Sequence, residues 1–431
     1  MDFKELYKKK LVSVEEILSK ISSKDEIVSA MAASEPQGIL SKLHTIKDRV
    51  EDVTVVVCLP MKDYEFFMNP SMKGHFLTES WFYTAGLRKA HKYGTVSFIP
   101  NHLHLASTKR LYYRKPRFYL GTATRMDKNG YLSLSLGITY EKDIIENADY
   151  VVLEVNENLP RTYGDTQIHI SQVDFIVENH APVPEIPIVE PNEKDKIIGN
   201  YIAELVEDGS TIQLGIGGIP NAVAKALLNK KDLGIHTEMF TEGMVDLFEA
   251  GVITNKKKTL WKGKSVATFA LGTKKLYDFI DDNMGVEFQR GVVVNDPYVI
   301  GQNYKMISIN TALQVDLTGQ VCSESLGIRQ FSGTGGQADT AVGAQISKEG
   351  KSIIALYSSV KDDTISTIVP VLTEGAAVTL SRNDVDYIVT EYGIAEMRGR
   401  SIRDRLKNLI NIAHPKFRDE LKEKAKNLMI W

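Results

Sequence analysis

A glutamate that follows a glycine-rich turn is the feature of this sequence with the clearest chemical meaning. Glu238 stands in the run Gly234–Phe240, and the turn Gly215–Pro220 precedes it along the chain. A carboxylate is a weak nucleophile, but one that is shielded from water and aimed at a thioester can exchange acyl groups through covalent intermediates. Glycine-rich turns before a helix leave backbone N–H groups free to bind an anion. The pair therefore predicts a nucleophile beside an oxyanion or phosphate site.

The segment around the turn predicts a strand, a tight turn and a helix. Thr211–Gly215 is the expected strand, and Pro220 is expected at the first position of the helix, where its missing N–H costs least. An ordinary strand-to-helix connection has the same pattern. A dinucleotide fold is a second alternative, because Gly215 and Gly217 begin its fingerprint and Glu238 would bind the ribose. Pro220 replaces the third glycine of that fingerprint and so disfavours it.

A second glycine cluster lies in Gln330–Thr340 and contains Gly335 and Gly336. Because glycine has no Cβ, backbone amides there can approach a ligand closely, and the two loops can together bind the carbonyl oxygen and thiol arm of one substrate. A loop that is merely mobile is the alternative. Ile309–Asp316 is predicted to end a strand beside the same cleft. Glu391 is predicted to follow another strand, where an acid is more often solvated than catalytic.

Histidines and a serine elsewhere do not complete a catalytic site. His102, His104 and His236 have side chains suited to a metal or to base catalysis, but no further ligands recur at metal-site spacing. Ser332 lacks the Gly-x-Ser-x-Gly context of a hydrolase nucleophile. Neither a metal centre nor a Ser-His-Asp triad is therefore predicted.

The composition is that of a globular protein long enough for two domains. The chain has 431 residues, 43% of them hydrophobic, and a net charge of -3, which disfavours a nucleic-acid partner. Cys58 and Cys322 are predicted to be buried free thiols in a reducing compartment. No apolar run approaches the ~20 residues that a membrane span needs, and we expect a cytoplasmic protein.

Short apolar runs alternate with helical patterns, which predicts an α/β fold with parallel sheets and functional loops after the strand C-termini. Four prolines within 181–191 disfavour helix and central strand, so we expect a linker there and two α/β domains, 1–185 and 186–431. The expected strands are 53–59, 95–99, 118–121, 130–136, 150–155, 211–215, 235–240, 266–270, 291–294, 306–310, 352–356 and 387–389. The expected helices include 14–18, 40–49, 140–147, 194–207 and 220–230.

Five motifs occur in an order shared with one protein family: Gly215–Pro220, His236–Met239, Phe331–Gln337, Ser381–Asp384 and Val389–Gly399. With them the chain resembles the acetyl-CoA hydrolase/transferase family, and within it the 4-hydroxybutyrate and butyrate–acetate CoA-transferases. The resemblance covers essentially the whole chain. Residues 60–115 are more individual and are expected to carry the preference for the acid substrate.

The resemblance implies two domains of similar open α/β topology, of the CoA-transferase type, with the active site at their interface. It also implies a catalytic glutamate that carries coenzyme A as a thioester. By motif this glutamate is Glu238, and Glu391 takes the place of a supporting acid. The implied contacts with coenzyme A are Gly215, Ile216, Gly217, Gly218, Ile219, Leu313, Gly335 and Gly336.

The implied activity is ping-pong transfer of coenzyme A between an acyl-CoA and a short-chain carboxylic acid, either 4-hydroxybutyrate or butyrate with acetate. The alternative is an acetyl-CoA hydrolase that admits water to the same site. Coenzyme A and acyl-CoA are substrates in both cases, and no permanently bound cofactor, metal, nucleic acid or membrane is expected. A homodimer or higher homo-oligomer is usual in the family.

Overall fold

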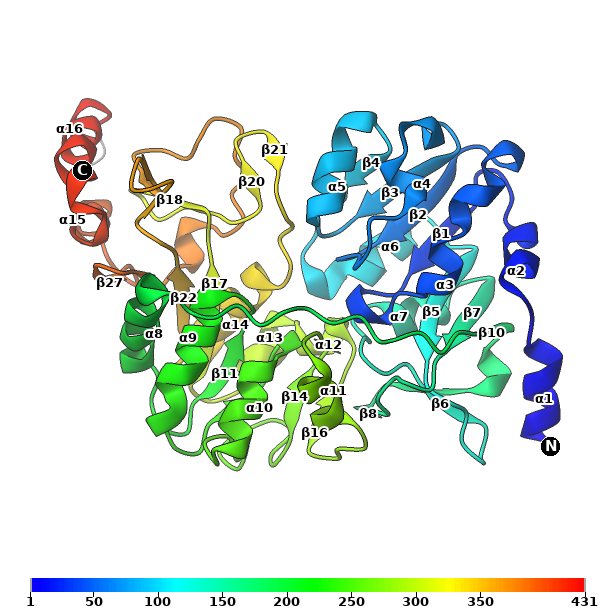
Figure 1. The fold of residues 1–431 in the computed structure, drawn as a ribbon. Coiled ribbons are helices and arrows are strands. Elements are labelled where there is room, and N and C mark those ends of the chain that lie inside the picture. The colour runs from blue at the N-terminus through cyan, green and yellow to red at the C-terminus, as the bar shows by residue number, and fades with distance from the viewer. Residues whose placement is uncertain (1, 430–431) are drawn as a thin grey trace. The chain divides into compact units, whose positions relative to one another are not determined.

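The computed structural model describes residues 2–429, which form two compact units. The first unit contains the chain up to Ile186 together with Val266–Val294, and the second contains Pro187–Ser265 and the chain from Asn295 onward. The chain leaves the first unit within the proline-rich segment predicted as a linker, which forms neither helix nor strand (Figure 1). Each unit has its own parallel sheet and its own helices.

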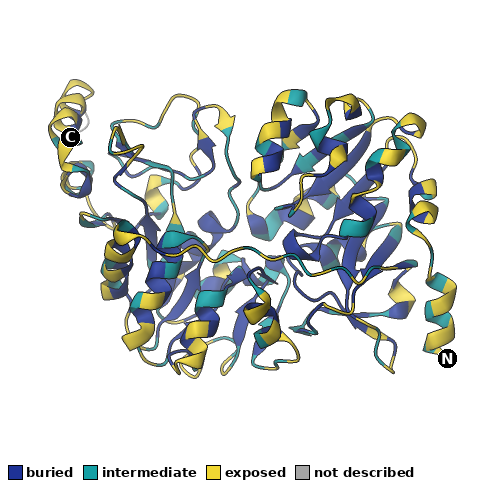
Figure 2. Ribbon diagram, viewed as in Figure 1, coloured by how far each residue is buried: buried dark blue, intermediate teal, exposed yellow. Residues whose placement is uncertain are grey.

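The first unit is built on seven parallel strands that lie in the order β10 (Phe175–Glu178), β7 (Tyr150–Val155), β5 (Phe118–Ala123), β1 (Glu26–Ser29), β2 (Val53–Val57), β3 (Phe76–Ser80) and β4 (Val96–Phe98). β1, β2 and β5 are buried along their whole length, as expected of central parallel strands covered on both faces. Apolar side chains fill the space around them, and Figure 2 shows these strands as buried and the outer helix faces as exposed.

The first two helices of the first unit begin at polar side chains that cap them. Asp2 accepts hydrogen bonds from the backbone N–H groups of Lys4 and Glu5, and Ser13 caps the next helix in the same way. The helices are α1 (Phe3–Lys10), α2 (Val14–Lys20), α3 (Gln37–Leu40), α4 (Glu65–Met68), α5 (Ala85–Ala90), α6 (Ala106–Tyr113), α7 (Glu141–Ile145), α11 (Lys274–Ile280) and α12 (Gly291–Val294). Short strands add β6 (Tyr131–Ser133), β8 (Tyr163–Gly164), β9 (Gln167–His169), β14 (Ser265–Ala267), β15 (Phe269–Ala270) and β16 (Val286–Phe288).

The segment Val266–Val294 packs with the first unit through backbone pairing and charge. β16 pairs in parallel with β8. The Arg290 guanidinium forms ion pairs with Asp143 at 2.8 Å, Glu146 at 2.6 Å and Asp165 at 2.5 Å. Several such bonds to one guanidinium fix the end of the segment against α7.

The second unit has a six-stranded sheet in the order β12 (Gly234–Ile235), β11 (Thr211–Leu214), β17 (Met306–Thr311), β22 (Lys351–Ala355), β26 (Tyr387–Thr390) and β27 (Gly393–Glu396). The first five strands are parallel, and β27 returns antiparallel to β26 after a tight turn. The carboxyl ends of the five parallel strands therefore lie along one edge of the sheet, where functional loops of α/β proteins gather.

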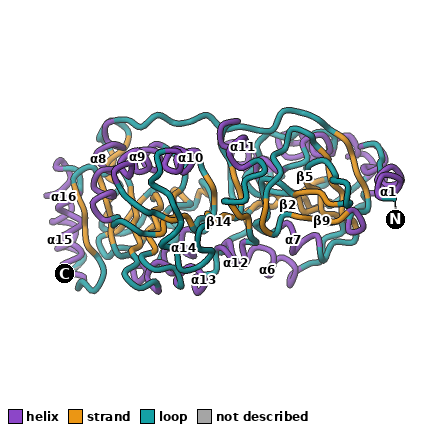
Figure 3. The backbone as a smooth tube through the Cα atoms, turned by 90° about the horizontal axis from the view of Figure 1, so that it is seen from below, coloured by secondary structure: helices purple, strands orange, loops and turns teal. Residues whose placement is uncertain are grey.

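Helices cover both faces of this second sheet. Figure 3 shows α8 (Glu193–Leu205) and α9 (Gly218–Ala226) on one side of the strands and α13 (Pro297–Gly301) and α14 (Gln337–Ile346) on the other. The remaining elements are α10 (Glu242–Glu249), α15 (Ile402–Ile412), α16 (Arg418–Asn427), β13 (Met239–Phe240), β18 (Gln314–Asp316), β19 (Val321–Cys322), β20 (Ser325–Leu326), β21 (Arg329–Gln330), β23 (Ser359–Val360), β24 (Ile365–Ser366) and β25 (Ile368–Val369).

The predicted α/β class with parallel sheets is confirmed, but five local predictions are wrong. The run 266–270 is covered by two short strands, β14 and β15, which belong to different sheets. The run 235–240 is two short strands, β12 and β13, with Glu238 in the bend between them. The run 291–294 is helix α12, because four apolar residues cannot distinguish a buried helical turn from a strand. The segment 40–49 is mainly a 3-10 helix, η2 (Leu43–Arg49). Helix α9 begins at Gly218, so Pro220 occupies its third position.

Three predictions from composition can also be compared with the structure. Cys58 and Cys322 are buried and form no disulfide bond, as predicted. Over residues 2–429, no helix combines the length and apolar character needed to cross a membrane. In the same part of the chain, no group of three or more His, Cys, Asp or Glu side chains is arranged to hold a metal ion.

Candidate active site

Glu238 lies in the loop that follows β12, at the carboxyl edge of the second unit's sheet. The neighbouring parallel strands β11, β17 and β26 end at the same edge. The glycine turn Gly215–Ile219 follows β11, Leu313 lies in the loop after β17, and Glu391 follows β26. Residues that are far apart in sequence therefore follow strands that share one edge of one sheet.

Asn295 and Gly336 hold the carboxyl group of Glu238. The side-chain amide of Asn295 donates from Nδ2 to Oε2 at 3.2 Å, and the backbone N–H of Gly336 donates to the same carboxyl group. A Cβ at Gly336 would lie 1.9 Å from Glu238 Oε2 and 2.3 Å from Asn295 Nδ2. Any other residue there would displace these two side chains, and this explains one glycine of the second cluster.

The environment of Glu238 favours its neutral form. Burial raises the pKa of this carboxyl group to about 7, and the negative charge of Asp339 contributes to the rise. The hydrogen bonds from Asn295 and Gly336 act in the opposite direction. The residue as a whole is of intermediate exposure. A desolvated carboxylate with a raised pKa is more basic than one in water and is a candidate nucleophile.

The first glycine turn joins β11 to α9 with its backbone accessible. Ile216 is 42% exposed, and a Cβ at Gly215 would meet nothing within 4 Å. Gly217 has a φ of 116°, which favours glycine, and it precedes the first turn of α9. The N-terminus of a helix favours an anion in general. Gly218 has a different role, because a Cβ there would lie 2.3 Å from Asp195 Oδ2 on α8.

The second glycine loop is anchored rather than loose. The backbone N–H groups of Phe331 and Ser332 donate to the carbonyl of Glu324 at 2.7 and 3.0 Å. The Thr334 hydroxyl donates to the Glu324 carboxylate at 3.0 Å. Glu324 is itself buried. These bonds disfavour the alternative of a merely mobile loop.

Glu391 and Leu313 have local partners at the same edge. The Glu391 carboxylate accepts hydrogen bonds from the backbone N–H and the hydroxyl of Ser358 at 2.9 and 2.8 Å, and it lies 3.4 Å from Lys194 Nζ. Its side chain is 6% exposed, so it is not a solvated loop acid. The backbone N–H of Leu313 donates to the Cys322 carbonyl at 2.9 Å. None of these bonds reaches Glu238.

Sequence reasoning missed Asn295. It directly follows the apolar run 291–294, which was predicted as a strand, and nothing in the local sequence marks it as a partner of Glu238. The two residues are 57 positions apart in the chain, and only the packing of the second unit brings them together.

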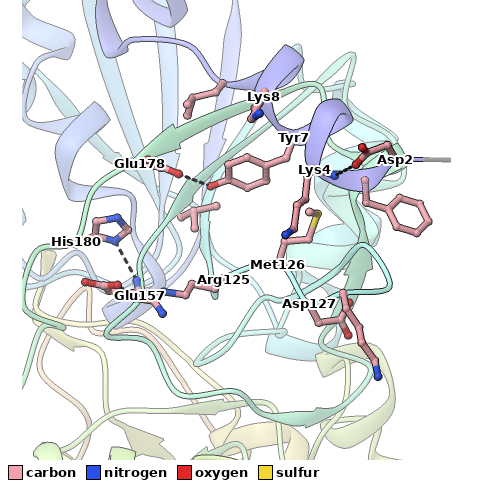
Figure 4. A pocket seen from close by; sticks show the side chains of 14 residues that line it. Asp2, Lys4, Tyr7, Lys8, Arg125, Met126, Asp127, Glu157, Glu178 and His180 are labelled. Atoms are coloured by element: carbon pink, nitrogen blue, oxygen red, sulfur yellow. Dashed lines mark hydrogen bonds and ion pairs between the residues drawn. The ribbon is translucent and has the colours of Figure 1, made fainter.

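A cavity of about 1010 Å³ in the first unit contains none of the predicted site residues. It is lined by α1 and by the loops that follow β5, β7 and β10 (Figure 4). Its acidic groups have local partners: Glu178 accepts a hydrogen bond from the Tyr7 hydroxyl at 2.9 Å, and Glu157 forms an ion pair with Arg125. The candidate active site is therefore assigned to Glu238.

Comparison with known proteins agrees with this fold. A solved 4-hydroxybutyrate CoA-transferase from Porphyromonas gingivalis superposes with a TM-score of 0.85 at 35% identity, covering 99% of this chain and 100% of that one. The 4-hydroxybutyrate coenzyme A transferase of Clostridium kluyveri is 45% identical over 99% of both chains. The succinyl-CoA:cyclohexane-1-carboxylate CoA transferase of Geobacter metallireducens is 44% identical over 98% of this chain and 96% of its own. The protein is therefore an enzyme of the CoA-transferase type.

Family matching leads to the same class. The N-terminal domain of the acetyl-CoA hydrolase/transferase family matches residues 1–190, and the C-terminal domain of that family matches residues 272–425. The chain belongs to the acetyl-CoA hydrolase/transferase family. Relatives named for butyrate with acetate or acetyl-CoA are 36% and 38% identical, whereas relatives named as acetyl-CoA hydrolases are 28% and 26% identical.

Proposed function

We propose that this enzyme transfers coenzyme A between an acyl-CoA and a short-chain carboxylate, 4-hydroxybutyrate or butyrate with acetate, through a glutamyl-CoA thioester on Glu238. The observation that carries the proposal is the buried carboxyl group of Glu238 between two hydrogen-bond donors, Asn295 and Gly336. The names of its curated relatives support the choice of acids. The greater distance of the hydrolases supports transfer over hydrolysis.

The reaction consists of four acyl substitutions without an external acid or base. The Glu238 carboxylate attacks the acyl-CoA carbonyl; a C–O bond forms, the C–S bond breaks, and a mixed anhydride and CoA thiolate result. The thiolate attacks the glutamyl carbonyl of the anhydride, which forms glutamyl-CoA and releases the first acid as its carboxylate. The acceptor carboxylate then repeats these two steps in reverse and leaves as the new acyl-CoA.

Each step passes through a tetrahedral intermediate that carries a negative oxygen. The N–H of Gly336 and the amide of Asn295 are already directed at the glutamyl carboxyl group. In this proposal they bind the oxyanion that forms at the glutamyl carbonyl. A donor of this kind is worth about 3–4 kcal/mol in acyl-transfer enzymes.

We assign the coenzyme A moiety to the two glycine loops. The accessible turn Gly215–Ile219 and the N-terminus of α9 suit a phosphate group. Gly335 adjoins the Gly336 N–H, and Leu313 follows β17 at the same edge of the sheet. Glu391 supports the site through the Ser358 loop that it anchors.

Covalent trapping tests the proposal. The enzyme is incubated with acyl-CoA in the absence of an acceptor acid, reduced with borohydride and digested, and the modified peptide is located by mass spectrometry. We expect the modification on Glu238 and a loss of activity in proportion to it. Loss of activity with an unmodified Glu238 would contradict the mechanism. Free CoA released with and without acetate separates transfer, which needs the acid, from hydrolysis, which does not.

The pH dependence of kcat/KM follows from the raised pKa of Glu238. The nucleophile must be ionised, so we expect kcat/KM to fall as the pH decreases through about 7, the pKa of this buried carboxyl group, and to reach about one tenth of its plateau one pH unit lower. A glutamate with the ordinary pKa of 4.5 would place this limb near pH 4.5.

A second buried acid serves as the control for this pH profile. Burial also raises the pKa of Glu35 in the first unit to about 7. The variant Glu35→Gln removes that titration and should keep the limb near pH 7. Disappearance of the limb in Glu35→Gln would assign it to Glu35 and contradict our interpretation.

A further inference from the structure

A polar network joins three elements of the second unit behind the second glycine loop. It consists of Gln213 on β11, Ser308 and Asn310 on β17, and Thr340 on α14. Thr340 Oγ1 lies 2.9 Å from Ser308 Oγ and accepts a hydrogen bond from Asn310 Nδ2 at 3.1 Å. Gln213 Oε1 lies 3.2 Å from Ser308 Oγ and accepts the backbone N–H of Ile309 at 3.1 Å.

The network is shielded from water. Gln213, Ser308 and Thr340 are 5%, 0% and 3% exposed, and Asn310 is of intermediate exposure. Hydrogen bonds in such a low-dielectric interior are strong, and a well-satisfied network holds its members in one arrangement. The network therefore fixes the start of α14 to β17 and β11.

Thr340 connects this network to the residue that contacts Glu238. Its backbone N–H donates to the carbonyl of Gly336 at 2.9 Å, the first helical hydrogen bond of α14. Its hydroxyl also donates to the carbonyl of Gln337 at 3.3 Å. The carbonyl side of Gly336 is thus held by Thr340, while its N–H is bonded to Glu238.

The other end of the network reaches the first glycine turn. Gln213 is the third residue of β11, and one residue separates it from Gly215. The two glycine loops, which we assign to one substrate, are therefore connected through this network and through Leu214, which follows Gln213 in the chain. A displacement of either glycine loop would therefore strain the hydrogen bonds of this network.

We propose that Thr340, held by Ser308 and Asn310, is a positioning residue that aligns the Gly336 N–H with the glutamyl carboxyl group during transfer. This inference rests on the proposed function and deepens it. Thr340 acts through the Gly336 peptide and not on the substrate. The alignment has to hold in the tetrahedral intermediates that form at the glutamyl carbonyl, and displacement by a fraction of an ångström weakens such a bond.

The variant Thr340→Val tests this role because it keeps the shape of the side chain and removes its hydroxyl. We expect kcat to fall about ten-fold, the loss of one aligned hydrogen bond, with the KM for acyl-CoA unchanged. The acid limb of kcat/KM should move above pH 7, because a weaker Gly336 bond no longer lowers the pKa of Glu238. Thr340→Ser keeps a hydroxyl and should restore most of the rate.

Two further variants keep the test decisive. Gln213→Leu perturbs the network from its far end and should change kcat and the pH limb in the same direction, even if Thr340→Val folds poorly. Thr211→Val is the matched control, since Thr211 is fully buried on β11 and its hydroxyl has no hydrogen-bond partner. This control should have the rate and pH profile of the parent enzyme.

The outcomes separate this inference from the proposed function. If the parent enzyme yields the Glu238 adduct while folded Thr340→Val and Gln213→Leu retain parental kcat and the parental pH limb, the positioning role is overturned and the mechanism stands. If the parent enzyme yields no adduct on Glu238, the mechanism itself fails.

Discussion

Replacement of Glu238 by alanine is expected to abolish CoA transfer, with kcat reduced by about 10⁴-fold or more, because the reaction then has no nucleophile. Glu238→Asp is expected to retain the carboxylate but to lose about 10²–10³-fold in kcat. The side chain is shorter by one methylene, and displacement of a reacting atom by about 1 Å costs about 10²-fold. Steady-state transfer from butyryl-CoA to acetate measures both effects.

The exposed acid Glu204 on α8 provides the control for these variants. Glu204→Ala should have the activity of the parent enzyme, and thermal unfolding followed by circular dichroism should show that all three variants are folded. Activity of Glu238→Asp within a few-fold of the parent would be incompatible with nucleophilic attack by this carboxylate.

Gly336→Ala is expected to reduce kcat by about 10²–10³-fold although it adds a single methyl group. The new Cβ would lie 1.9 Å from Glu238 Oε2, and at that distance the carboxyl group or the peptide has to move. Either movement removes the hydrogen bond between them, and oxyanion donors contribute about this much to kcat. The same transfer assay measures the effect, and trapping of glutamyl-CoA should be slowed in parallel.

Gly215→Ala is the informative comparison, because a Cβ there meets nothing within 4 Å in this structure. The protein should fold with unchanged thermal stability, and the KM for acyl-CoA should rise if coenzyme A approaches this turn. A fully active Gly336→Ala enzyme would show that the close contact with Glu238 is not used in transfer. An unchanged KM in Gly215→Ala would place coenzyme A elsewhere.

Much of the architecture could be predicted from the chain because parallel α/β folds have a strong local pattern. The buried or nearly buried strands β2, β5 and β7 appear in the sequence as short β-branched or aromatic runs. β1 was missed, although it is central, because its four residues include Glu26, whose charge is balanced by Arg110 at 2.6 Å in the folded protein. A buried charge with a distant partner has no local signature.

The wrong secondary-structure predictions near the site also arise because contacts between residues distant in sequence decide the local structure. The bend that carries Glu238 divides the run 235–240 into the two short strands β12 and β13, and α12 is a helix although its three valines favour a strand. In both cases tertiary packing overrides propensity, which differs by less than about 1 kcal/mol per residue between the two states.

The order of residues alone predicted the α/β class, the edge of the sheet where functional loops gather and Glu238 as the candidate nucleophile, since each depends on short-range periodicity or on a contiguous motif. The folded chain alone decided that Asn295 and Gly336 meet the Glu238 carboxyl group and that burial raises its pKa to about 7. Contacts and desolvation depend on the three-dimensional arrangement of the residues. Asn295 and Glu238 are 57 positions apart and come into contact only when the second unit folds.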